Sequence, residues 1–168
     1  TFDMGGTSTD VARYDGGFDY RFETVVGNAR LQAPALAIET VAAGGGSVCG
    51  FDGDRLFVGP ESAGSSPGPA CYGAGGPLTM TDVNLLLDRL DPTTFGIPVF
   101  PENARQRLNE LLDRMQTASG QRPEAQTVLE GFVQIANETM AEAVRKISVA
   151  KGYDPADHAL VAFGGAGG

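Results

Sequence analysis

The sequence contains a single histidine, His158, and only two cysteines, Cys49 and Cys71. So few ligands cannot build a zinc site of the Cys/His type. Two cysteines also make no disulfide framework, so a reducing, cytoplasmic environment is the default expectation.

Basic residues are scarce as well. Twelve lysines and arginines face 21 aspartates and glutamates, which gives a formal net charge of −9 at pH 7. Because no segment forms a basic stripe, we expect no nucleic-acid partner. No apolar run approaches the roughly 18 residues of a membrane span and no signal peptide is visible, so we expect no membrane partner. The chain also lacks an initiator methionine, and we interpret it as a segment of a longer protein.

Glycine, in contrast, is abundant. The 168 residues suit a single domain, and ten of the 24 glycines gather at positions 44–46, 73–76 and 164–168. Such clustering indicates close approach of the backbone to another group rather than general flexibility.

Strands are expected mainly in the first 41 residues, with a hairpin at Asp15-Gly16-Gly17. The expected strands cover residues 1–2, 11–14, 19–26, 35–41, 56–58 and 160–163. Helices dominate from residue 81: one capped by Thr81 and running to about Leu90, one from Pro101 to Gly120, and one from near Pro123 that ends before Gly152. This order predicts an α/β fold, in which a mixed sheet with N-terminal hairpin strands is covered by helices.

The first glycine-rich loop, residues 3–10, reads DMGGTSTD. Its successive N–H groups can bind phosphate oxygens, and its hydroxyl groups add donors. Asp3 and Asp10 would repel a phosphate unless a magnesium ion bridged them to it. No lysine follows the glycines, so this is not a P-loop. Taken alone, the loop fits equally well with a β-bulge hairpin that has solvated hydroxyl groups.

Two further loops follow apolar stretches. Gly44-Gly45-Gly46-Ser47 permits close approach either by a ligand or by the first loop. The run of residues 164–168, GGAGG, leaves a strand and can accept a nucleobase or ribose against bare backbone. Its spacing is not the Rossmann fingerprint.

Four phrases in this order resemble the hydantoinase A/5-oxoprolinase family. They are FDMGGTSTDV (2–11), ETVAAGGGSV (39–48), VGPESAGSSPGPACYGAGGPLTMTDVNLLL (58–87) and VAFGGAGG (161–168). The resemblance runs from end to end, although residues 95–155 are generic. Many relatives have proline at the position of Gly168, which bears on subfamily. The resemblance implies an ATP- and Mg²⁺-dependent enzyme that opens a cyclic amide, such as 5-oxoproline or a hydantoin, by phosphoryl activation.

The resemblance also implies a ribonuclease-H-like lobe, the second of two lobes around a nucleotide cleft, and a companion hydantoinase B-type subunit or domain. This chain would then hold half of an active site. Asp3 and Thr7 would be catalytic, and Asp3 and Asp10 would hold magnesium. The residues expected to bind the nucleotide are Gly5, Gly6, Thr7, Ser8, Thr9, Gly44, Gly45, Gly46, Ser47, Gly164, Gly165 and Gly167.

Two alternatives stay open: an ATP-dependent ketone carboxylase subunit, and a sugar-kinase-like or regulatory ATP-binding lobe. The phrase at 58–87 counts against the kinase, and a single histidine excludes a metal-only hydantoinase within this chain. Other polar residues have undecided roles. Four polar residues either reach substrate or build the loop: Glu61, Ser62, Ser65 and Ser66. Cys71 is a nucleophile or, more simply, a buried thiol. His158 is structural or exposed, and Asp82 either interacts favourably with the helix dipole or faces the cleft.

Overall fold

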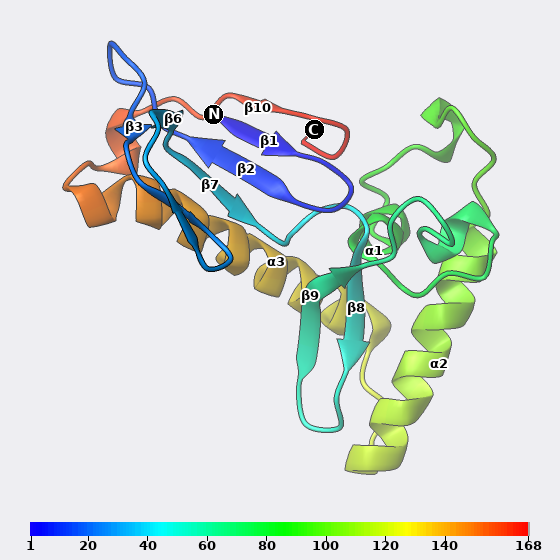
Figure 1. The fold of residues 1–168 in the computed structure, drawn as a ribbon. Coiled ribbons are helices and arrows are strands. Elements are labelled where there is room, and N and C mark those ends of the chain that lie inside the picture. The colour runs from blue at the N-terminus through cyan, green and yellow to red at the C-terminus, as the bar shows by residue number, and fades with distance from the viewer. Residues whose placement is uncertain (168) are drawn as a thin grey trace.

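The computed structural model describes residues 1–167, and a four-stranded sheet forms one side of the molecule (Figure 1). Strands β1 (Phe2–Met4), β2 (Thr9–Ala12) and β7 (Ile38–Val41) pair antiparallel, and β10 (Ala162–Phe163) joins β1 in parallel. The order across the sheet is β10-β1-β2-β7. The expected mixed sheet with N-terminal hairpin strands is therefore confirmed.

The long helix α3 (Ala125–Ile147) packs against both the sheet and the rest of the chain. Its C-terminal half packs on the sheet, where Ala143 and Ile147 bury Val11. Its N-terminal half supplies Phe132 to a larger core. That core also takes residues from α1 (Met80–Leu86), α2 (Pro101–Ser119), β8 (Ser47–Phe51) and β9 (Leu56–Ser62).

The helix boundaries partly match expectation. Helix α2 begins at Pro101 and ends at Gly120, whose φ of 77° suits a left-handed C-cap. The cap of α1 is Thr79 rather than Thr81, because Thr79 forms a capping box with Asp82. Helix α3 ends at Ile147, and short 3₁₀ turns complete the helical elements: η1 (Ala70–Tyr72), η2 (Pro92–Thr94), η3 (Val149–Lys151) and η4 (Pro155–Asp157).

The strands differ more from expectation. The continuous return strand expected at 19–26 is wrong: it is split into β3 (Tyr20–Arg21) and β4 (Thr24–Val26). A second hairpin then follows, with β5 (Ala29–Leu31) paired to β4 and β6 (Ala35–Leu36) paired to β3. Its turn is Gly27-Asn28, and Gly27 has a positive φ of 59°, which a two-residue hairpin turn requires. Strand β8 was also not expected.

Within residues 1–167, no helix combines the length and apolar character needed to cross a bilayer.

Asp82, which is fully buried, organises the long loop between β9 and α1. Its carboxylate accepts hydrogen bonds from the N–H groups of Ala70 (3.0 Å), Cys71 (2.8 Å) and Thr79 (2.8 Å), and from the hydroxyl of Thr79 (2.9 Å). A buried carboxylate is costly unless such donors replace water. Because Asp82 has no exposed surface, the alternative in which it faces a cleft is wrong; it ties the loop to the start of α1.

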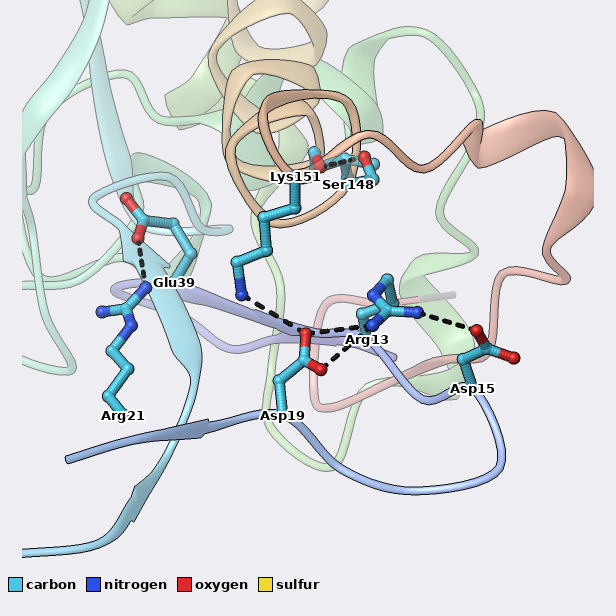
Figure 2. A network of polar contacts seen from close by, with 8 residues as sticks. Arg13, Asp15, Asp19, Arg21, Glu39, Ser148 and Lys151 are labelled. Atoms are coloured by element: carbon cyan, nitrogen blue, oxygen red, sulfur yellow. Dashed lines mark hydrogen bonds and ion pairs between the residues drawn. The ribbon is translucent and has the colours of Figure 1, made fainter.

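A network of charged side chains joins the first hairpin region to the end of α3 (Figure 2). The guanidinium of Arg13 donates to both oxygens of Asp19, at 3.0 and 3.2 Å, and Lys151 donates to Asp19 at 3.3 Å. Glu39 similarly accepts from Arg21 and from Lys146, each at 3.2 Å. These contacts connect the segment after β2, strands β3 and β7, the C-terminal end of α3 and η3.

We expect the substitution Asp82→Asn to lower the free energy of unfolding by on the order of 3 kcal/mol. The amide keeps one acceptor oxygen and turns an NH₂ group toward backbone donors, so at least one donor stays unsatisfied. Urea denaturation measures the change. Asp157→Asn is the control, because Asp157 is exposed, and it should shift the same quantity by less than about 0.5 kcal/mol. Equal midpoints for the two variants would contradict this role of Asp82.

The free energy of unfolding should fall in acid, because Asp19 and Glu39 become protonated and lose their ion pairs. Burial pushes the pKa of each carboxyl up, but hydrogen bonds from Lys151 and Arg13 to Asp19, and from Lys146 and Arg21 to Glu39, outweigh it and hold both pKa values below their usual range. The stabilisation is therefore complete above the unfolded pKa values, near pH 4, and is lost as the pH falls through the lowered values.

Thermal unfolding between pH 2.5 and 6 checks this dependence. The double variant with Asp19→Asn and Glu39→Gln should show a flatter decline of the unfolding temperature toward acid than the unmodified protein. Glu142→Gln, at an exposed residue with no ion pair among residues 1–167, should leave the decline as it was. A double variant as acid-sensitive as the unmodified protein would refute the assignment.

Candidate functional site

The three glycine-rich loops meet at one end of the four-stranded sheet, beyond the turn between β1 and β2 (Figure 1). Gly45 and Gly46 donate backbone hydrogen bonds to the carbonyl oxygens of Gly5 (3.1 Å) and Gly6 (2.6 Å). From the C-terminal loop, Ala166 donates to the carbonyl of Met4 at 2.9 Å. Segments far apart in the sequence thus form one cluster of backbone groups.

Glycine is required where the second loop crosses the first. A Cβ atom on Gly44 would lie 2.7 Å from the carbonyl oxygens of both Gly5 and Gly6, and one on Gly46 would lie 2.9 Å from that of Gly6. Real Cβ atoms essentially never approach other atoms so closely. Of the two roles left open for this loop, the structure shows approach to the first loop.

The second loop itself is covered. Gly44, Gly45, Gly46 and Ser47 are all buried, and the Ser47 hydroxyl accepts a hydrogen bond from the N–H of Gly44 at 2.9 Å. The direct nucleotide contact expected for these four residues therefore does not fit their positions, because their polar groups are engaged within the protein. Their contacts support the first loop instead.

The tip of the first loop is open. The N–H of Gly5 donates to the carbonyl of Ser8 at 2.9 Å, which closes the hairpin and leaves Gly6 and Thr7 exposed at its end. Within residues 1–167, the N–H groups of Gly6 and Thr7 make no hydrogen bond, and a Cβ on Gly6 would meet nothing within 4 Å. These donors are available to an acceptor outside the chain.

Thr9 departs from expectation. It is fully buried and its hydroxyl donates to the carbonyl of Ala43 at 2.6 Å. A hydroxyl donated inside the protein does not reach a phosphate on the outside, so its expected contact with the nucleotide does not fit. Thr9 anchors the second loop to β2.

Asp3 and Asp10 face each other directly across β1 and β2. Like charges in this arrangement are destabilising, and within residues 1–167 neither carboxylate forms an ion pair. The hydroxyl of Thr40 donates to Asp10 at 2.5 Å. Gly164, with a φ of 95°, lies so close to Asp3 that a Cβ would overlap the Oδ1 atom of Asp3 and lie 2.5 Å from the carbonyl oxygen of Met4.

These two carboxylates suit magnesium better than an all-protein metal site. Among residues 1–167, no group of three or more histidine, cysteine, aspartate or glutamate side chains could hold a metal ion. Magnesium is usually held by one or two carboxylates, with phosphate oxygens and waters as the remaining ligands. The paired acids beside the free N–H groups of Gly6 and Thr7 match that donor set.

The C-terminal loop borders the same cluster. Gly165 is exposed, with nothing within 4 Å of the position of a Cβ, and the N–H of Gly167 donates to the carbonyl of Gly164 at 3.3 Å. The side chain of Ala166 lies beside Gly45. Gly168 lies outside the described residues, so the position at which many relatives have proline is not placed.

Other polar residues of the sequence have ordinary roles or face solvent. Burial and the nearby charge of Asp82 raise the pKa of the fully buried Cys71 thiol, so it is neutral and a poor nucleophile. His158 lies in the turn after η4, with Nδ1 3.0 Å from the carbonyl oxygen of Asp154. Ser62 at the end of β9 lies beside Gly46, whereas Glu61 in β9 and two residues of the following loop, Ser65 and Ser66, are exposed.

Two threonines of the cluster were not expected from sequence. Thr40 holds Asp10, and Thr81 donates from both its N–H (2.8 Å) and its hydroxyl (2.9 Å) to the carbonyl of Gly45. Thr81 thus attaches the start of α1 to the second loop. The sequence predicts instead that this residue caps the helix, because its partner Gly45 is distant in the chain.

Comparison with known proteins gives consistent matches. Residues 1–168 match the family described as Hydantoinase/oxoprolinase. The chain is 48% identical over 176 residues to the 5-oxoprolinase PfmaA of Pestalotiopsis fici, covering 99% of this chain and 14% of that protein. It is 37% identical over 172 residues to the caprolactamase subunit alpha of Pseudomonas jessenii, covering 100% of this chain and 24% of that subunit. This chain thus spans a small part of the curated relatives that it matches.

A solved structure shares the fold. A chain of nucleotide-free acetone carboxylase, from a study of ATP-dependent acetone carboxylation, superposes with a TM-score of 0.82 at 24% identity. The superposition covers 99% of this chain and 24% of that one.

We expect Gly44→Ala to destabilise the protein by about 1–3 kcal/mol, the usual cost of forcing an extra methyl group into a packed site. The methyl would meet backbone atoms of Gly5 and Gly6, which cannot rotate away. Thermal unfolding measures the loss. Gly17→Ala is the matched control, because its Cβ would have nothing within 4 Å and no positive φ is involved, so its unfolding temperature should stay within error. If both variants have the same unfolding temperature, the two loops do not pack as described.

Proposed function

Because this chain belongs to the hydantoinase/oxoprolinase family, we propose that it supplies part of the nucleotide site of an ATP-dependent enzyme that opens a cyclic amide. The intact enzyme's activity is a proposal, since the chain covers 14% of the 5-oxoprolinase with which it is 48% identical.

One observation carries the proposal. Within residues 1–167, Asp3 and Asp10 form no ion pair, and they stand opposite each other on the two strands that flank the free N–H groups of Gly6 and Thr7. A carboxylate pair without a cation favours binding of a positive ion, and free N–H groups at a glycine turn favour a phosphate. Magnesium together with a polyphosphate satisfies both requirements at once.

Six residues of the first loop have a role in this proposal. The N–H groups of Gly6 and Thr7 would donate to phosphate oxygens, with Gly5 fixing the turn and the hydroxyls of Thr7 and Ser8 adding donors. Asp3 would hold magnesium directly or through water, and Asp10 would be the second carboxylate that holds the ion. Magnesium-bound ATP would supply the phosphoryl group that activates the amide oxygen, after which water opens the ring.

Thr40 and the second loop would keep this arrangement in place. The hydroxyl of Thr40 orients Asp10, and the buried run of Gly44 to Ser47 fixes the backbone of Gly5 and Gly6. Preorganised donors need no rearrangement when charge develops on the transferred group.

We further propose that the sheet is the core of a ribonuclease-H-like lobe, the second of two lobes around the nucleotide. Three antiparallel strands, β1, β2 and β7, followed by helix α3 and a strand parallel to β1 support this. In this arrangement Gly164, Gly165 and Gly167 would line the adenosine site. The first lobe, and a companion hydantoinase B-type subunit or domain, would complete the active site in the cytoplasm.

Two relatives support a cyclic amide as the substrate. They are named as a 5-oxoprolinase and a caprolactamase subunit, and the second name also supports a multi-subunit enzyme. The similarity to acetone carboxylase concerns the fold, so the carboxylase reading serves as an alternative outcome of the test.

The test uses the intact enzyme with its companion subunit and measures phosphate release from Mg-ATP. We expect 5-oxoproline, hydantoin or N-methylhydantoin to stimulate release, and Asp3→Asn to reduce the stimulated rate by about 100-fold or more, because charge stabilisation at the phosphates is lost. Stimulation only by acetone with bicarbonate would favour a carboxylase. ATP binding without any stimulation would favour a kinase-like or regulatory lobe.

A second readout separates magnesium binding from stability. Without magnesium, Asp3→Asn should unfold at the same or a higher temperature, because it removes a like-charge pair. It should also lose the rise in unfolding temperature that Mg-ATP gives to the unmodified enzyme. Asp54→Asn, an exposed residue in the turn between β8 and β9, should behave as the unmodified enzyme in both measurements. A full Mg-ATP effect in Asp3→Asn would remove Asp3 from the site.

A further inference from the structure

Residues 18–36 contain strands β3 to β6, of which β3 and β6 are labelled in Figure 1, and we call this segment the apolar ribbon. Every residue from 25 to 36 is exposed. The exposed fraction reaches 71% for Phe22, 62% for Val25 and 59% for Val26. Phe18, Tyr20 and Leu31 are also more than half exposed. Large apolar side chains thus gather on a segment that buries none of them.

Such a ribbon is poorly supported by its own contacts. A two-stranded hairpin alone is marginally stable in water, and strands β4 and β5 pair only with each other within residues 1–167. Contiguous exposed apolar surface of this kind marks an interaction site. The ribbon is therefore expected to be covered when the protein is intact.

The charge of the ribbon indicates what covers it. The chain has a net charge of −9, yet residues 18–36 contain two acidic and two basic side chains, Asp19, Glu23, Arg21 and Arg30. All four are engaged in ion pairs: Asp19 with Arg13 and Lys151, Arg21 with Glu39, and Arg30 with Glu23. The surface offered is consequently neutral and apolar, which favours a partner surface without net charge.

The base of the ribbon is fixed in direction. Arg13 is buried, and its guanidinium carbon lies 3.5 Å from the centre of the Tyr153 ring. The guanidinium nitrogens of Arg13 also donate to Asp19 (Figure 2). The ammonium group of Lys151 also donates a hydrogen bond to Asp19. A segment held in this way loses little conformational freedom on docking, which favours association.

We propose that the apolar ribbon docks on a neutral, apolar surface of the same polypeptide, outside residues 1–168. The relatives support this occupant: the stretch equivalent to this chain is 14% of the 5-oxoprolinase and 24% of the caprolactamase subunit, so most of each polypeptide lies elsewhere. A second copy is the alternative occupant, and the mass of the crosslinked species distinguishes it. The proposal rests on family membership and not on the activity proposed above.

The test places a photo-crosslinking benzoylphenylalanine at Phe22 in the intact, purified protein. We expect crosslinks to peptides outside residues 1–168, identified by mass spectrometry, in a species whose mass on a denaturing gel is that of one polypeptide. The same group at Ile97, an exposed apolar residue away from the ribbon, is the control and should give no such set of crosslinks. Crosslinks to a second copy or to a separate subunit would overturn the proposal.

Hydrogen exchange on the same intact protein gives an independent answer. The backbone N–H groups of β4 and β5 should exchange at least roughly a hundredfold more slowly than those of the exposed turn at residues 52–55, because a docked ribbon opens rarely. Val26→Asp should remove that protection and leave the rate of ATP-dependent phosphate release unchanged, because Val26 lies outside the three glycine-rich loops. Fast exchange at β4 and β5 in the unmodified protein would show that nothing covers the ribbon.

Discussion

The backbone contact between Gly44 and the pair Gly5-Gly6 is the constraint on which the candidate site depends. The first loop is the turn of a hairpin in the four-stranded sheet, and the second loop leads directly into β8 and the larger core. Their carbonyl and N–H groups bond to each other, and the carbonyl of Gly45 is held in turn by Thr81 at the start of α1. The sheet, the second loop and α1 are thereby aligned by main-chain atoms, with no room for a side chain between the loops.

Two other features keep that alignment. Helix α3 packs on the sheet with one half and on the larger core with the other, so the two regions share a single rigid element. Asp82 joins the loop before α1 to the first turn of that helix with four hydrogen bonds. At the open tip of the first loop, the N–H groups of Gly6 and Thr7 lack partners within residues 1–167, and such groups are strong sites for an acceptor.

Local sequence signals predicted some elements and not others for physical reasons. Helix α2 was predicted from end to end because Pro101 and Gly120 mark its two termini. Strand β8 was not, because Gly50 weakens a strand pattern and its reason is distant: the ring of Phe57 fills the space that a side chain would take. The cap of α1 depended on choosing between two threonines, and the reciprocal bond with Asp82 decides for Thr79.

The residues of the candidate site likewise fall into those that local sequence signals identify and those that depend on distant partners. The acids and glycines of the first loop were recognisable because their chemistry is contained in eight consecutive residues, 3–10. The roles of Thr40 and Thr81 were not, since their partners lie 30 and 36 residues away. Thr9 and Ser47 show the opposite error, because a hydroxyl beside a glycine loop has the same appearance in the sequence whether it faces outward or anchors the backbone.

A face built from main-chain atoms has a consequence for how such proteins diverge. Natural variation changes side chains, but the glycines of this cluster have none, and even a methyl group is excluded at two of them. At Gly44 it would overlap the backbone of the first loop, and at Gly164 it would overlap the carboxylate of Asp3. A 5-oxoprolinase and a caprolactamase subunit both align with nearly the whole of this chain. Change at these glycines is therefore limited by the backbone itself, however freely side chains vary elsewhere in the chain.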